Sequence, residues 1–323
     1  MKPFFTRTLC CALALAVSCP ALAQQGDALT ATIETDDADR FIALWRESGG
    51  NPTAEQLQRR YVDAGSRAVE IFTPGRIESG ANLAATIAGQ PQLYADAIDR
   101  CYPWVKAANG ELRATYLALS GLLPDKPLPR IAVLFGADNS GGTAAPGMQV
   151  LGLEVLCRLA PDEAAFRDRL RSFFAHETVH TLQDIPDEAG QDDPLLAWAL
   201  AEGGADYVAS LVTGRTINPE RDAWARANEG MVWREFAADR AILRDPEADV
   251  EERQAAFARW FANAGSPPEG WPSELGYWVG MRIAESHVDR AQDRRAAIRQ
   301  LLAFDDAGAV LAASDLAGRL AAN

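Results

Sequence analysis

Two histidines and a glutamate stand together as His176-Glu177-Thr178-Val179-His180, in a chain that has 3 histidines in all, so a chance match is improbable. On an α-helix, residues i and i+4 lie on the same face, so His176 and His180 can each offer a ring nitrogen to one metal ion. This HExxH spacing is typical of zinc hydrolases, whose zinc–nitrogen bonds are ~2.0–2.1 Å long. Glu177 lies beside the pair, where its carboxylate can take a proton from a metal-activated water. The motif predicts a zinc site with Glu177 as general base.

A third protein ligand is needed, because a catalytic zinc usually has three protein ligands and one water. His287 is one candidate, and a carboxylate downstream of the motif is the other. A helix is expected from Pro194 to Gly214, and it carries Glu202 and Asp206 four residues apart on one face.

Two glycines, Gly203 and Gly204, lie between these two acids. Each costs a helix roughly 1 kcal/mol relative to alanine. A helix tolerates that cost where a neighbour packs very close to its backbone, and we expect the HExxH helix to be that neighbour.

The set of His176, Glu177, His180, Glu202 and Asp206 resembles the gluzincins, the thermolysin-like branch of the zincin metallopeptidases. The resemblance implies that Glu202 is the third zinc ligand. It also implies that Asp206 binds the outer nitrogen of a ligating histidine. The stretch LLAWALAEGGADYVASLVTG is similar to a group of bacterial proteins known only as zinc-dependent proteases, and weaker similarity extends over about residues 37–303. That group implies no defined substrate.

Zincins often place a hydrogen-bond donor opposite the general base, where it stabilises the oxyanion of the tetrahedral intermediate. The candidates are Tyr277, Arg282 and His287. Tyr277 is preferred, because its Gly-Tyr-x-x-Gly context resembles the tyrosine-bearing segment of the same bacterial proteases.

The N-terminus predicts export. Residues 1–23 combine a basic start, an apolar middle and the small-residue sequence Ala21-Leu22-Ala23, as in a signal peptide. We expect cleavage after Ala23 rather than lipid attachment at Cys19, and a periplasmic or secreted protein. No later segment is expected to span a membrane.

The formal net charge is −14, which argues against nucleic acid as a partner, because phosphates require a basic surface. Cys101 and Cys157 remain after the signal, and an oxidising compartment permits a disulfide between them, although sequence alone leaves that pairing open. The oligomeric state is also left open.

The predicted fold class is α+β: a predominantly helical, zincin-like fold with a small sheet and an HExxH helix. An N-terminal helical region (24–125) precedes a zincin-like catalytic domain with a helical C-terminal lobe (126–323). The hydrophobic pattern predicts N-terminal helices at Asp37–Glu47, Ala54–Phe72, Gln92–Lys106 and Glu111–Leu123, with a break at Gly80.

Two strands are predicted, Arg130–Phe135 and Met148–Val155, with a glycine-rich loop at 139–143 between them. By analogy with zincins, Met148–Leu153 would be the edge strand that pairs with an extended substrate. The HExxH helix is expected to begin at Pro161. Further helices are expected at Pro194–Thr213, Pro219–Leu243, Val250–Ala262 and Glu274–Arg290, with Asn218 and Ser273 as N-caps.

These features predict an exported zinc metallopeptidase with one Zn²⁺ per chain and a peptide or protein substrate. Two other classes stay open. One is an inactive zinc protein that binds a peptide or a cell-wall component, which the intact Glu177 disfavours. The other is a zinc hydrolase of a non-peptide amide or ester.

Overall fold

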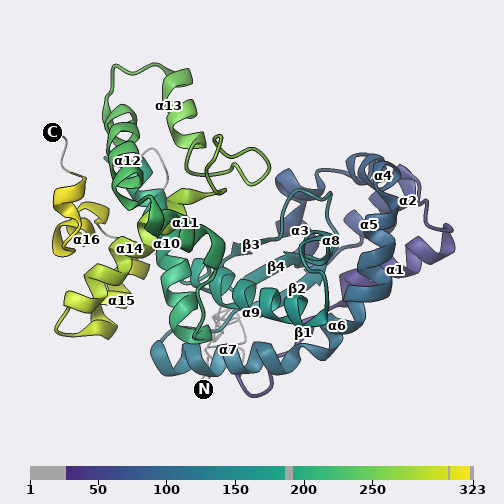
Figure 1. Cartoon of the computed structure of the whole chain (residues 1–323). Helices are drawn as coiled ribbons and strands as arrows, with labels where there is room; N and C mark the ends of the chain where they lie inside the picture. The colour runs from purple at the N-terminus through teal and green to yellow at the C-terminus, as the bar shows by residue number, and fades with distance from the viewer. Residues whose placement is uncertain (1–26, 186–191, 305, 321–323) are drawn as a thin grey trace, which may run out of the picture.

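A small sheet lies between two groups of helices in the computed structural model, which describes residues 27–185, 192–304 and 306–320 (Figure 1). The HExxH helix α9 (Glu163–His180) runs between the sheet and the C-terminal helices. The protein is therefore mostly helical with a small mixed sheet, and the α+β prediction is confirmed at that level. The expected signal segment, residues 1–23 with Cys19, lies outside the described residues.

The sheet has the strand order β1-β2-β4-β3. β1 (Ile33–Glu34), β2 (Arg130–Leu134) and β4 (Met148–Gly152) are parallel, and β3 (Gly142–Ala145) pairs antiparallel with β4. The predicted edge strand is wrong, because β4 is internal and β3 forms the edge. β3 begins in the segment predicted as a glycine-rich loop, where its pairing depends on β4 rather than on its own apolar pattern. β4 ends at Gly152, and helix α8 (Leu153–Arg158) follows directly.

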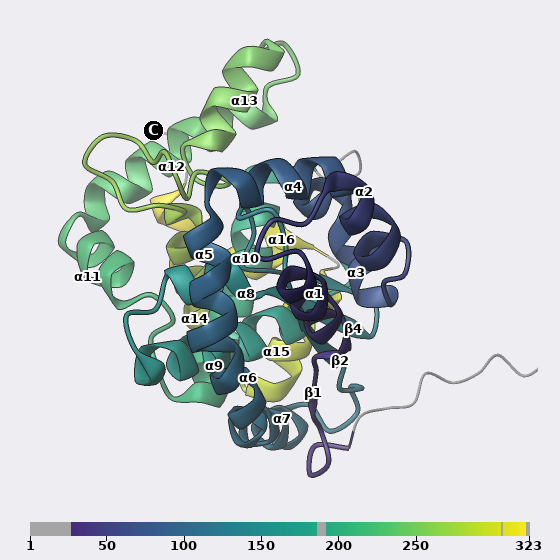
Figure 2. The ribbon, with the colours of Figure 1, turned by 90° about the vertical axis from the view of Figure 1, so that its right-hand side faces the viewer.

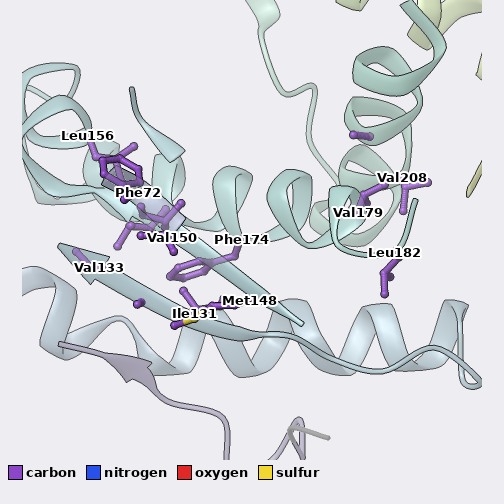
Figure 3. Close-up of a cluster of buried hydrophobic side chains, with 14 of the residues drawn as sticks. Phe72, Ile131, Val133, Met148, Val150, Leu156, Phe174, Val179, Leu182 and Val208 are labelled. Carbon is purple, nitrogen blue, oxygen red and sulfur yellow. The ribbon is translucent and has the colours of Figure 1, made fainter. Parts of the chain in front are cut away.

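β4 is buried along its whole length, and α9 covers one of its faces. Figure 3 shows Phe174 of α9 directed toward Ile131 and Met148 of the sheet. Gln149 of β4 is the one polar exception, and its amide donates to the Phe174 carbonyl (3.3 Å) and to the Thr178 hydroxyl (2.5 Å). These contacts fix the height and rotation of α9 over the sheet.

Helix α9 begins at Glu163, two residues later than predicted. Asp162 is its N-cap, and the side-chain oxygen accepts from the Ala165 backbone N–H at 2.8 Å. Phe166, Leu170 and Phe174 repeat every fourth residue and are fully buried. His176, Glu177 and His180 therefore lie on the polar face of the last turn.

The N-terminal helices face the viewer in Figure 2. α1 (Asp36–Glu47) and α7 (Asn109–Leu122) match the prediction within two residues. The predicted helix Ala54–Phe72 is broken, because the chain turns before Ser66 caps α3. The bounds there are α2 Ala54–Leu57, η1 Gln58–Val62 and α3 Arg67–Phe72.

A helix that was not predicted, α4 (Gly80–Gly89), follows the N-cap Ser79, and the expected break lies just before it, at residues 78–79. The predicted helix Gln92–Lys106 forms as three consecutive segments, α5 Pro91–Asp96, η3 Ala97–Cys101 and α6 Tyr102–Ala107. A disulfide joins Cys101 of η3 to Cys157 of α8, which answers the pairing left open by the sequence.

The C-terminal helices are α10 Pro194–Thr213, α11 Pro219–Ala227, α12 Glu229–Arg244, α13 Val250–Ala258, α14 Leu275–Arg290, α15 Arg294–Ala303 and α16 Ala307–Ala313. The predicted helix Pro219–Leu243 is interrupted at Asn228. Ser273 is not the N-cap of α14. Glu274 is the residue directly before this helix, and it has the left-handed conformation (φ 56°).

By length and composition α10 could cross a membrane, and 72% of its most apolar window is buried inside this fold.

Helices α10 and α14 touch backbone to backbone at two glycines. A Cβ atom on Gly203 would lie 2.2 Å from the Met281 nitrogen, and one on Gly280 would lie 1.6 Å from the Ala199 oxygen. Gly203 has the close neighbour that the sequence predicts. That neighbour is α14, however, and not the HExxH helix. Gly204 has no comparable contact, with the Gln183 side chain 4.0 Å away.

The buried carboxylate of Glu154 organises the loop that leads from β2 to β3. Its Oε1 accepts from the backbone N–H groups of Gly136 (3.1 Å) and Asp138 (3.3 Å). Burial raises the pKa of Glu154 to about 7, although both hydrogen bonds act in the opposite direction. The path of the chain into the edge strand therefore depends on a carboxyl group within the core.

The helix crossing yields the first prediction. Gly203→Ala should destabilise the protein by about 1–3 kcal/mol or more, because α14 must move away from the added methyl group. Gly204→Ala is the matched control, and it should be neutral or stabilising, since alanine favours a helix by roughly 1 kcal/mol. Urea unfolding of the two variants measures the difference. Equal free energies of unfolding would show that the crossing is not tight.

Candidate metal centre

Three helices bring the predicted site residues together. The last turn of α9 carries His176, Glu177 and His180. The middle of α10 carries Glu202 and Asp206, and the first turn of α14 carries Tyr277. The close crossing at Gly203 places α14 against the same stretch of α10 that holds both acids.

The three expected ligand atoms form a compact triangle. His176 Nε2 and His180 Nε2 are 2.9 Å apart, and Glu202 Oε2 lies 3.3 Å from the first and 3.2 Å from the second. Two ligand atoms on a tetrahedral zinc are separated by ~3.3 Å when the bonds are ~2.0–2.1 Å long. His176, His180 and Glu202 are thus a possible metal-binding triad with the right spacing.

The outer nitrogen of each histidine has an acceptor of its own. His176 Nδ1 is 2.8 Å from Asp206 Oδ1, and His180 Nδ1 is 2.7 Å from Gln183 Oε1. The Gln183 amide is oriented by its other end, which donates to the Ala201 carbonyl at 2.9 Å. With the protons on Nδ1, both Nε2 lone pairs point at each other and at a carboxylate. That arrangement is repulsive when neutral, and a cation among the three atoms removes the repulsion.

Asp206 is almost fully buried and uses both carboxylate oxygens. Oδ1 binds His176, and Oδ2 accepts from Nη2 of Arg221 at 2.5 Å. Arg221, on α11, also donates to the Glu274 carbonyl (3.2 Å) at the start of α14. One buried ion pair therefore connects α10, α11 and α14 behind the triad.

Glu177 lies next to the triad without joining it. Its side chain is 8% exposed, and a Cβ atom on Gly142 would lie 3.0 Å from its Oε1. The carboxylate is therefore directed at the first residue of edge strand β3. Burial raises the pKa of Glu177, and the nearby His180 and His176 act to lower it. A carboxylate in this position can exchange a proton with a group bound between the triad and β3.

The ring of Tyr277 stacks on the ring of His176. The two rings are 5.9 Å apart between centroids with an interplanar angle of 15°, and the Arg221 guanidinium lies 4.8 Å from the Tyr277 ring. Burial and the charge of Glu202 raise the pKa of Tyr277 well above its usual value. The phenol thus stays protonated and can donate a hydrogen bond.

Without a metal, the buried charges act strongly on one another. Burial lowers the pKa of His176, but hydrogen bonds to Asp206 and Glu202 raise it by more. Burial raises the pKa of Glu202, but the charge of His180 and the hydrogen bond to His176 lower it by more. The pKa values of the histidines are raised and that of Glu202 is lowered, which favours positive charge on the histidines beside negative charge on Glu202. A metal ion would compete with protons for the same atoms.

Within the described residues no hydrogen bond or ion pair joins the two other candidates to the triad. His287, considered as third ligand and as oxyanion donor, is 5% exposed and lies in the last turn of α14. It does not belong to the cluster of ligand atoms. Arg282 pairs with Glu285 on its own helix.

The sequence did not predict three features of the centre. These are Arg221, Gln183 and the Gly142 edge, which contact Asp206, His180 and Glu177. Only Gln183 had an available signal, because it follows the motif by three residues and so can reach back to His180.

Comparisons of the chain with protein-family models, with curated proteins and with solved structures give no match.

Substitutions at Glu202 and Asp206 should distinguish a metal ligand from a residue that only orients a ligand. Glu202→Ala should abolish tight zinc binding, because it removes one of three ligands. Asp206→Asn should weaken binding by about 10–100-fold, because it disturbs the orientation of His176 without removing a bond to the metal. Asp168→Asn, on the exposed part of α9, is the control and should bind like the wild type. Metal analysis and chelator competition give the affinities, and full zinc content in both site variants would contradict the assignment.

Proposed function

We propose that this protein is an exported, zinc-dependent metallopeptidase of gluzincin type that hydrolyses peptide bonds. The observation that carries the proposal is the spacing of the His176, His180 and Glu202 ligand atoms, with Asp206 hydrogen-bonded behind His176. A His₂Glu donor set is the one found in thermolysin-type catalytic zinc sites. One Zn²⁺ per chain is expected at this centre.

The sheet supports a zincin-like arrangement. An antiparallel edge strand, β3, lies beside the HExxH helix, and its first residue is against Glu177. An extended peptide can add to such an edge through main-chain hydrogen bonds. In this proposal β3 takes the role that the sequence analysis had assigned to Met148–Leu153.

The chemistry divides among three groups. Zinc, when bound, supplies Lewis acidity that makes water easier to deprotonate and a carbonyl easier to attack. Glu177 takes the proton of the attacking water and passes it to the leaving amine. The Tyr277 hydroxyl donates to the oxygen on which negative charge develops, and its raised pKa keeps that proton in place.

The partners and location remain part of the proposal. A peptide or protein is the expected substrate, and the net charge of −14 disfavours nucleic acid. We take α10 as a core helix rather than a membrane span, because most of its apolar window is buried and it carries Glu202 and Asp206. Export depends on the signal-like residues 1–23.

Glu177→Gln tests the general base. The amide fills the same space but cannot take a proton, so turnover on a peptide substrate should fall by ~10²–10⁴-fold. Zinc content and melting temperature should stay the same, because Glu177 is not a ligand. Glu163→Gln, at the exposed start of the same helix, should keep full activity. A peptide-library digest with both variants decides the matter, and unchanged turnover of Glu177→Gln would remove the base from the mechanism.

Tyr277→Phe tests the oxyanion donor. It removes one hydroxyl, so kcat should fall by roughly 10²–10³-fold. Zinc content and KM should change little, because the donor acts only once charge builds on the carbonyl oxygen. Tyr207→Phe, on α10 outside the triad, serves as control. Full activity combined with a lower melting temperature would identify Tyr277 as a packing residue.

A further inference from the structure

Arg76 brings a cation from the N-terminal region to the loop that leads into edge strand β3. It lies on the segment η2 (Thr73–Ile77) that connects α3 to α4, and α3 packs against β3 and β4 (Figure 1). Two hydrogen bonds, through Ser140, join its guanidinium to Gly142, the residue of β3 that lies against Glu177. A part of the chain that carries no motif therefore supplies a cation on the β3 side of the centre.

Three hydrogen bonds attach this segment to the loop before β3. The Ala137 N–H donates to the Arg76 carbonyl (3.0 Å), and the Asn139 amide donates to the Gly75 carbonyl (3.0 Å). Arg76 Nε donates to the Ser140 hydroxyl at 3.2 Å. The position of the guanidinium is thus fixed relative to the edge strand.

The Ser140 contact continues to the site itself. Ser140 Oγ donates to the Gly142 carbonyl at 2.8 Å, and Gly142 is the residue that touches Glu177. A short chain of hydrogen bonds therefore runs from Arg76 to the residue of β3 next to the base.

The backbone of the segment is unusual in a way that indicates constraint. Gly75 has φ +71°, and Glu78, which is not glycine, has φ 62°. A left-handed non-glycine residue costs of order 1–3 kcal/mol and persists where its surroundings require it, often at ligand sites. The two positive φ values turn the chain on either side of Arg76, whose Nε donates to Ser140 of the loop.

Arg76 has no carboxylate within the 4.0 Å ion-pair distance among the described residues. It is half-buried, and its burial lowers its pKa. Nη1 donates to the Pro74 carbonyl (3.3 Å), whereas Nη2 makes no hydrogen bond within the described chain and is not enclosed. A partly desolvated guanidinium with an open donor atom is a favourable site for an anion, above all a carboxylate.

We propose that Arg76 binds a carboxylate of the substrate, so that the enzyme prefers peptides with an acidic group near the cleaved bond. This proposal rests on the proposed peptidase function. The carboxylate is either an Asp or Glu side chain or the C-terminus of the peptide, and both offer the same planar pair of oxygens. On the β3 side of the centre the carboxylate of Glu177 repels such a group, and Arg76 supplies the attraction that offsets it.

A purely structural role for the charge of Arg76 is a weaker explanation. The loop is already attached through the Ala137 and Asn139 hydrogen bonds, and neither uses the guanidinium. Ser140 needs only a hydrogen-bond donor, which a glutamine can supply. Removal of the charge should therefore alter substrate choice while the loop stays in place.

The test compares matched peptides. A peptide cleaved in the library digest is resynthesised with Glu or Gln at each position around the bond, and with a free or amidated C-terminus. The wild type should cleave the carboxylate form about 10–100-fold faster in kcat/KM than the neutral form at one position. That position distinguishes a side chain from the C-terminus.

Arg76→Gln should reduce this preference, measured as the ratio of kcat/KM for the carboxylate and neutral forms of one peptide, to below about 3-fold. Arg76→Lys should keep part of the preference, because the charge stays and the planar fork is lost. Arg169→Gln is the matched control: Arg169 is also a partly buried arginine whose pKa is lowered by burial, but it donates to the Leu159 carbonyl and should not affect the preference. An unchanged preference in Arg76→Gln, or an equal loss on acidic and neutral peptides, overturns the proposal.

A binding experiment separates this proposal from the peptidase function. In the Glu177→Gln background, unlabelled alanine hexapeptides that carry one Glu or one Gln, with free or amidated ends, are titrated by isothermal calorimetry. A Kd for the carboxylate peptide that rises about 10-fold on Arg76→Gln supports the role of Arg76 even when the wild type cleaves nothing. Equal Kd values for acidic and neutral peptides overturn it, whatever the wild type cleaves.

Discussion

The Asp206 carboxylate is the group on which the candidate centre depends. Both of its oxygens are used, one by His176 and one by Arg221, in a position that is only 1% exposed. Burying this charge is costly unless it is fully paired, and two charge-assisted or polar partners offset that cost. The bond to Nδ1 fixes the tautomer and the rotation of His176, which directs Nε2 into the triad. The bond to Arg221 fixes the start of α14, and so the place of Tyr277. The loss of this carboxylate would therefore affect both the orientation of His176 and the start of α14.

Such a connected group of polar side chains requires helices that approach closely, and glycine permits this. α10 and α14 meet with Gly203 and Gly280 in contact with the opposite backbone. Each glycine costs a helix roughly 1 kcal/mol, and the cost is offset only if close packing follows. The packing brings Glu202, Asp206 and Tyr277 within one side-chain length of α9. The composition of α10, rich in small and apolar residues, is thus explained by its position at the centre of the C-terminal helices.

Local patterns in the sequence predict much of this protein, and contacts between distant segments account for what they miss. The i, i+4 pairs on α9 and α10 follow from helix geometry, as do the bounds of α10 and the N-cap at Asn218. Edge strand β3 could not be predicted, because a glycine-rich segment has no strand pattern and becomes a strand only when β4 pairs with it. The helix predicted to contact Gly203 was wrong for the same reason, because a glycine in a helix indicates a close neighbour but does not identify it. Arg221 and Arg76 have no local signal, since each acts through partners more than ten residues away.

The centre is assembled from two parts of the chain that are attached to the sheet separately. The possible metal-binding triad comes from α9 and α10, and α9 is fixed to β4 through Gln149. The surface opposite them comes from β3 and the Thr73–Ile77 segment, which are fixed by Glu154, by Ser140 and by the packing of α3. Glu177 lies where the two parts meet, with its carboxylate against Gly142 and within the field of Arg76. The possible metal-binding triad depends on the first part alone, whereas the surface opposite it depends on the second. Within the described residues no hydrogen bond joins the Thr73–Ile77 segment to His176, His180 or Glu202, so changes in this segment should alter that surface and leave the triad in place.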